Sequence, residues 1–166
     1  GFYERLLFQD RFLLAGSAAR LAQVPQPDDL RPDTLGDLPL LLLEDGHCLT
    51  DQALEVCGRA RSDARIDTGA ASLATLSQLV AAGFGLTLMP EMAGAAETAA
   101  APNMLLRRFS APEPARQIGL VRRGGRSQGQ WFDDLADLLA SVRHRLSDPL
   151  PDAPSDARPD MQKAGP

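Results

Sequence analysis

The stretch EDGHCLTDQALEVCG, residues 44–58, contains both cysteines of the 166-residue chain and decides how the rest is interpreted. The apolar run before it, Leu38 to Leu43, has the length of a strand, and an Asp-Gly turn signal follows it. Helix-forming residues come next and end at Gly58, a glycine suited to the position after a helix. The order predicts a strand, a turn and a helix, with Cys48 at the first helical position and Cys57 at the last.

The two ends of the predicted helix give its cysteines different chemistry. Cys48 is expected at the positive end of the helix dipole, beside His47, where a thiolate is favoured and reactive. Cys57 is expected at the negative end among apolar residues, where a thiol stays protonated. We therefore expect one attacking cysteine and one held in reserve.

Helix geometry limits how these two cysteines can interact. Nine residues of α-helix rise about 13.5 Å and rotate about 900°, so the two side chains lie on opposite faces. A disulfide requires Cα atoms within about 7 Å of each other. A bond between Cys48 and Cys57 thus requires the helix to unwind at least in part, which would make it a switch. The alternative is a pair of unrelated buried thiols, a common state of free cysteine.

Other segments alternate between strand and helix signals. Extended segments are expected at Phe2 to Phe8 and Phe12 to Ala15, and a strand at Gly85 to Met89. Ser72 is a candidate N-cap for the helix that leads to Gly83. An amphipathic helix from about Ser127 to Leu146 is expected to use an apolar stripe as core or subunit contact, formed by Trp131, Leu135, Leu138, Leu139, Val142 and Leu146. The alternation predicts an α/β fold.

Three segments carry a resemblance to a known family. They are Glu44-Asp45-Gly46-His47-Cys48-Leu49-x-Asp51-Gln52-Ala53 with Cys57, the run from Ser72 to Pro90, and Glu113-Pro114-x-Arg116-x-Ile118-Gly119-Leu120-Val121. Together they resemble OxyR, the hydrogen-peroxide-sensing regulators of the LysR type, over roughly residues 1 to 146. The second segment is generic to LysR-type effector domains. The His-Cys motif with a second cysteine nine residues on is specific to OxyR.

The resemblance implies an architecture with two lobes. It is the effector domain built like periplasmic binding proteins, with Rossmann-like lobes, of which the first is only partly present. On this template residues 1–11 end lobe one and cross over, residues 12–110 form lobe two with the cysteines, and residues 111–146 return to lobe one. Residues 147–166, rich in Pro, Asp and Ala, are expected to be a disordered tail. Because the chain starts without Met, we expect a fragment that lacks the DNA-binding winged helix-turn-helix.

The resemblance also implies roles for five residues. Cys48 would be the peroxidatic cysteine and Cys57 the resolving one, joined in a Cys48–Cys57 disulfide. His47 and Arg116 would polarise the pocket. Asp51 would order a water or an amide, although a first-turn acid also simply suits the helix dipole. The family's peroxide-binding threonines belong to the part of lobe one that we expect to be absent.

Composition narrows the function classes. A net charge of -5 argues against DNA binding by this chain alone, since phosphate contacts need a basic face. Two cysteines, no signal-peptide pattern and no membrane-length apolar run favour a cytoplasmic protein in which a disulfide is regulatory. The cysteine spacing does not fit a zinc site, and a Cys-His hydrolase is disfavoured because neighbours in sequence need not face each other. We expect no metal and no cofactor.

The sequence therefore predicts the regulatory domain of a peroxide-responsive transcription activator, not an enzyme. Its expected partners are hydrogen peroxide, a homodimer or homotetramer, DNA through the absent domain, and a cellular dithiol reductant, with no membrane. Two alternatives remain open. A LysR-type regulator that binds a small-molecule effector would use the same scaffold, and a thiol peroxidase would turn over many times with a reductant.

Overall fold

The computed structural model describes residues 1–36, 38–44, 46–59, 70–124 and 130–146. The predicted α/β fold is confirmed. Its elements in chain order are β1 (Phe2–Gly16), α1 (Ala18–Leu21), η1 (Pro27–Asp29), η2 (Pro32–Leu35), α2 (Cys48–Cys57), α3 (Leu73–Ala81), β2 (Thr87–Pro90), α4 (Glu91–Ala100), β3 (Leu105–Arg107), β4 (Ala115–Arg123) and α5 (Trp131–Leu146). The expected C-terminal tail, residues 147–166, lies outside the described residues.

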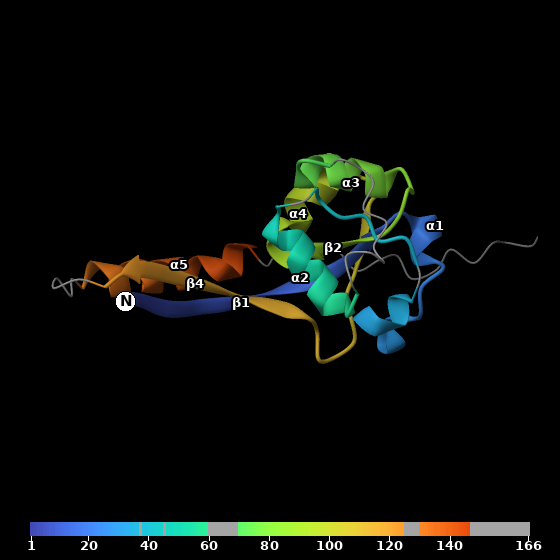
Figure 1. Ribbon diagram of the computed structural model, residues 1–166. Helices are drawn as coiled ribbons and strands as arrows, with labels where there is room; N and C mark the ends of the chain where they lie inside the picture. The colour runs from blue at the N-terminus through green and yellow to red at the C-terminus, as the bar shows by residue number, and fades with distance from the viewer. Residues whose placement is uncertain (37, 45, 60–69, 125–129, 147–166) are drawn as a thin grey trace, which may run out of the picture.

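Strand β1 runs through the whole molecule. The two expected extended segments form one strand of 15 residues with an irregularity between Leu6 and Phe8. Its first part, up to Arg11, pairs with β4, and from Phe12 onward it pairs with β2 and β3, all antiparallel. Figure 1 shows β1 and β4 extending with α5 beside them, away from the body that contains α1 to α4. The partner change at Phe12 makes β1 the connection between these two parts.

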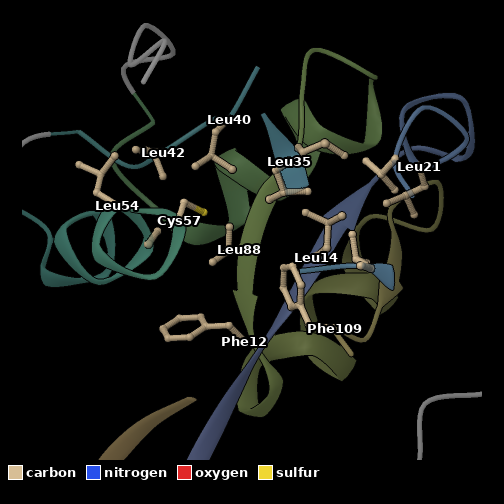
Figure 2. Packing of buried hydrophobic residues seen from close by; sticks show 14 residues of the cluster. Phe12, Leu14, Leu21, Leu35, Leu40, Leu42, Leu54, Cys57, Leu88 and Phe109 are labelled. Carbon is tan, nitrogen blue, oxygen red and sulfur yellow. The ribbon is translucent and has the colours of Figure 1, made fainter. Parts of the chain in front are cut away.

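Alternating side chains divide the core of the body into two clusters. On one side Leu14, Leu42 and Leu88 pack with α2, and Figure 2 shows this cluster with Cys57 inside it. Their neighbours in sequence, Ala15, Leu43 and Met89, pack with α3 on the other side. Successive residues of an extended chain point to opposite faces, so one layer of extended segments serves both clusters. Helix α2 therefore covers one face of this layer.

The segment before α2 corrects one prediction. Leu40 to Leu43 is buried and extended but forms only an isolated parallel bridge, Leu40 with Leu86, rather than a strand. Leu41 N–H donates to the Leu86 carbonyl at 2.7 Å, and Leu86 N–H donates to that of Pro39 at 2.9 Å. Pro39 has no N–H of its own, which limits the ladder at this point. A Cβ at Gly85 would lie 2.7 Å from the Pro39 oxygen, so glycine permits this approach.

Helix α5 uses the expected apolar stripe only in part as core. Trp131 and Leu138 are 58% and 61% exposed. Phe132 and Ala136 are the buried positions instead. The surface beneath α5 is formed by β1 and β4, and a ribbon two strands wide covers only a narrow part of a helix. Of the two expected roles of the stripe, core and subunit contact, the core role does not apply to these two exposed residues, and their subunit contact stays a prediction.

Candidate functional site

Helix α2 begins and ends at the two cysteines, as predicted. Its N-cap, His47, has extended backbone angles and makes no capping bond with its side chain. At the other end Gly58 adopts the left-handed conformation, with φ of 60°. There Gly58 N–H donates to Glu55 at 3.1 Å and Arg59 N–H to Leu54 at 3.0 Å, which satisfies the last carbonyl groups. The helix therefore has a closed C-terminus and an N-terminus without a side-chain cap.

The N-terminal half of α2 is attached to the body by a buried hydroxyl. Thr50 Oγ1 donates to the Leu43 carbonyl at 2.9 Å, while Ala53 and Leu54 enter the core. Beneath these residues lies a small cavity of about 10 Å³ lined by Leu42, Leu43, Leu49, Thr50, Ala53, Leu76, Thr87 and Leu88. Atoms that border empty space lose dispersion contacts, so the packing under this half of α2 is incomplete.

Cys57 is a buried, protonated thiol. Its side chain lies in the apolar cluster near Leu42, Leu54 and Leu88, and only 7% of the residue is exposed. Burial raises the pKa of Cys57 to about 11, against a smaller opposing effect of the Arg59 charge. The expectation of a protonated thiol is confirmed, but burial is the main cause rather than the helix dipole.

Cys48 is in the opposite situation. It is exposed, free, and occupies the first position of α2, with the half-buried His47 immediately before it. Asp51 is exposed and lies in the first turn of the same helix. The structure thus places His47, Cys48 and Asp51 at one end of α2 and Cys57 at the other. Because the two cysteines are the first and last of the ten residues of α2, the two thiols cannot bond until the helix unwinds.

Arg116 reaches α2 at Gln52 rather than at Cys48. Arg116 Nη1 donates to Gln52 Oε1 at 3.2 Å, and its guanidinium lies 5.8 Å from the centre of the Phe12 ring. Arg116 Nε and Nη2 lie 3.0 and 2.9 Å from Asp10 Oδ2. The predicted arginine is therefore beside α2 and is fixed by Asp10, which was not among the predicted site residues.

Asp10 was missed although the sequence contains a signal for it. It alternates with Phe8 and Phe12 on β1, so a carboxylate occupies a position where an apolar residue is expected. Gln52 was part of the quoted motif, but nothing in the sequence indicated a partner for it. Among the described residues, no group of three or more His, Cys, Asp and Glu side chains is arranged to hold a metal ion. No described helix is long and apolar enough to cross a membrane.

These features allow a two-step thiol chemistry. An exposed thiol at a helix N-terminus is open to a small oxidant, whereas a buried protonated thiol is a poor nucleophile. The second thiol becomes available only if the helix between them opens. The arrangement therefore separates the oxidation of Cys48 from any bond with Cys57.

The chain is similar to proteins of one family. The family profile described as the LysR substrate binding domain matches residues 1–144. A probable hydrogen peroxide-inducible genes activator of Mycobacterium avium is 47% identical over 109 residues, which are 65% of this chain and 35% of that protein. The DNA-binding transcriptional dual regulator OxyR of Escherichia coli K12 is 39% identical over 142 residues, 83% of this chain and 44% of that protein.

Solved structures give the same relationship. A mutant of Corynebacterium glutamicum OxyR, determined with bound hydrogen peroxide, superposes with a TM-score of 0.75 at 34% sequence identity. The match covers 89% of this chain and 46% of the other. The chain thus spans less than half the length of each of these three relatives.

Proposed function

Because the chain belongs to the LysR substrate-binding domain family, we propose that it is the regulatory part of a hydrogen-peroxide-sensing transcription regulator. The observation that carries the proposal is the contrast between the two ends of α2. Cys48 is exposed at one end, and Cys57 is buried at the other with its pKa raised to about 11. A relative named as a probable hydrogen peroxide-inducible genes activator supports hydrogen peroxide as the oxidant. The sensor reacts once per signal and does not turn over as an enzyme does.

In the first step the Cys48 thiolate attacks one oxygen of hydrogen peroxide. The sulfur is oxidised by two electrons to a sulfenic acid, the O–O bond breaks, and the leaving hydroxide takes a proton to become water. The Cys48 sulfur lies at the N-terminus of α2, whose backbone N–H groups can donate to the leaving oxygen. His47 comes directly before it, and Arg116 donates to Gln52 one turn further along the helix. Asp51, in the first turn of α2, orders a water or a backbone amide at the exposed end of the site.

In the second step Cys57 attacks the sulfur of the Cys48 sulfenic acid. The S–S bond forms, the S–O bond breaks, and hydroxide leaves with the Cys57 proton as a second water. This step requires α2 to unwind, which also brings Cys57 out of its apolar cluster. A cellular dithiol returns the two electrons and restores both thiols.

Refolding of α2 is the signal that reaches DNA. We place the DNA-binding domain outside this chain and the regulator in the cytoplasm, acting as a homodimer or homotetramer. When α2 unwinds, the face of the body that it covers changes, and this alters how the subunits pack. The new packing moves the DNA-binding domains on a promoter. The net charge of -5 is consistent with DNA contact by another part of the protein.

Peptide mapping after oxidation tests the proposal. The reduced protein is treated with one equivalent of hydrogen peroxide, quenched with an alkylating reagent and digested. We expect both free thiols to disappear and a Cys48–Cys57 crosslink to form. Cys48→Ser should abolish the crosslink, while Cys57→Ser should leave a Cys48 sulfenic acid that a dimedone-type probe traps.

Two results would contradict the proposal. Oxidation of Cys57 by peroxide in the Cys48→Ser protein, as fast as the loss of thiols in the wild type, would show that the attacking residue is wrong. Two alkylatable thiols that persist after peroxide would instead favour a LysR-type regulator that binds a small-molecule effector.

A further inference from the structure

Asp10 is a buried charge with no role in the chemistry described above. Its side chain has no solvent exposure, although it lies in a strand whose inward positions on either side are apolar. A carboxylate taken out of water is costly unless it is paired and fully hydrogen-bonded. The groups that pair with Asp10 therefore decide how its burial is offset.

Both oxygens of Asp10 are occupied by donors from other elements. Oδ2 lies 3.0 and 2.9 Å from Nε and Nη2 of Arg116 on β4. Oδ1 accepts the Met92 backbone N–H, in the first turn of α4, at 3.1 Å. Asp10 therefore joins β1, β4 and α4 at the place where β1 exchanges β4 for β2 and β3 as partners.

The guanidinium of Arg116, which Asp10 holds in place, has a further donor that reaches α2. Arg116 Nη1 donates to Gln52 Oε1 at 3.2 Å. Gln52 follows Cys48 by four residues, so the two share a helix face, whereas Cys57 lies on the opposite one. Unwinding that brings Cys57 to Cys48 must move the segment that contains Gln52, and the hydrogen bond to Arg116 cannot survive it.

Hydrogen bonds as well as packing attach this part of α2 to the body. The cavity of about 10 Å³ lies beneath Leu49, Thr50 and Ala53, at the same half of the helix. Thr50 and Gln52 each contribute a hydrogen bond to this attachment. The Thr50 bond is to the neighbouring Leu43, while the Gln52 bond is to the distant β4.

We propose that Asp10 is a positioning residue that directs Arg116 onto Gln52 and so latches α2 in its helical, reduced state. The inference rests on the proposed peroxide switch for its purpose, but the latch itself is a property of the reduced protein. Removing the latch would allow α2 to open more often. Disulfide closure would then follow sulfenic acid formation more quickly.

Hydrogen exchange of the reduced protein tests the latch without any oxidant. Asp10→Asn keeps the shape but removes the charge that holds Arg116, and Gln52→Ala removes the acceptor on α2. We expect the α2 amides to exchange about tenfold faster in both variants. Alanine is the better helix former, so faster exchange in Gln52→Ala reports the lost bond and not a weaker helix.

A matched control is available in α3. Gln78 Nε2 donates to the Ala100 carbonyl at 2.8 Å, so Gln78→Ala also removes a helix glutamine that is hydrogen-bonded to a residue far away in the chain. It should leave α2 exchange unchanged. The latch is overturned if Gln52→Ala leaves α2 as protected as in the wild type, or if α3 gains exchange as much as α2. Gln52→Ala decides the question even if Asp10→Asn does not fold.

A second measurement reads the latch through chemistry. Excess peroxide oxidises the Cys48 sulfenic acid further to sulfinic acid unless Cys57 reacts first. Both latch variants should give more disulfide and less sulfinic acid than the wild type. The double variant should go no further than either single one, because both changes break the same connection. Independent, additive effects would contradict the latch, whereas absence of any sulfenic acid would instead refute the proposed function.

Discussion

At the scale of single residues, the account depends on the contrast between two identical side chains. Cys48 is exposed at the start of α2, and Cys57 is buried at its end. The same ten-residue helix thus presents one thiol to solvent and keeps the other in an apolar cluster. The position of each thiol therefore predicts that Cys48 reacts before Cys57.

Alkylation of the native reduced protein should therefore be selective. Burial raises the pKa of Cys57 from 9.0 to about 11, so at neutral pH its thiolate is about 100-fold rarer than that of an unperturbed thiol. We expect a thiolate-directed reagent to label Cys48 first and Cys57 at least about 100-fold more slowly than in urea. Timed quenching and peptide mapping measure both rates. Equal labelling in the native protein would contradict the burial of Cys57.

The same thiol should make stability depend on alkaline pH. The folded protein binds the Cys57 proton more tightly than the unfolded chain, so its contribution is complete below about pH 9 and is lost as pH rises to about 11. We expect a loss on the order of 2 kcal/mol or less from this group. Urea unfolding across this range, compared with Cys57→Ala, isolates it, because the other titrating groups are shared. Parallel curves for the two proteins would refute the expectation.

Among the elements, α2 has a well-defined C-terminus at Gly58. Gly58 adopts φ of 60° with open space where a Cβ would lie, so a substitution there costs only backbone strain. Gly58→Ala should reduce the free energy of unfolding by about 1 kcal/mol, and Gly58→Asn by less, since asparagine tolerates this conformation. Urea titrations of the three proteins check the order. An alanine variant as stable as the wild type would contradict the cap.

Local patterns predicted the elements better than they predicted the contacts. The boundaries of α2 followed from an Asp-Gly turn and from Gly58, and Ser72 caps α3 through the Thr75 N–H at 3.2 Å. Leu40 to Leu43 was expected to form a strand because periodicity cannot show whether an extended segment finds a ladder partner. The link between Asp10 and Arg116 joins residues far apart in the chain, which no local pattern contains.

At the scale of the whole molecule, the turn where the chain returns to β4 is enclosed by charges. Arg11 and Arg108 each pair with Glu91 and Glu113, which forms a closed ring of two basic and two acidic side chains. The ring joins β1, the start of α4 and the segments on either side of the return. Because the arginines are nearly half exposed, salt should screen it.

Glu113→Gln tests how much the ring contributes. It removes two of the four pairs, and we expect a loss of about 1 kcal/mol or less at low ionic strength. The difference from the wild type should shrink at about 0.5 M salt, where the Debye length is only a few ångströms. Urea unfolding at two salt concentrations measures it. If the difference in free energy of unfolding does not depend on salt, Glu113 stabilises the protein by packing and not by its charge.

The division of the chain into two lobes and a tail stays a prediction at this scale. So does the subunit contact through the exposed face of α5, where Trp131 and Leu138 lie. The sequence suggested an apolar stripe there but could not show which side of the helix faces the ribbon, since that depends on a surface only two strands wide.

The central claim is that peroxide converts α2 from a helix with two free thiols into an unwound segment closed by a disulfide. Hydrogen exchange of the peptide spanning residues 48–57 tests it directly, in the reduced, peroxide-treated and re-reduced protein, with the crosslink followed in the same samples. The account predicts that protection of α2 is lost as the Cys48–Cys57 crosslink appears and returns when a dithiol removes it. Protection that persists in the crosslinked protein, or exchange that rises without a crosslink, would contradict the account.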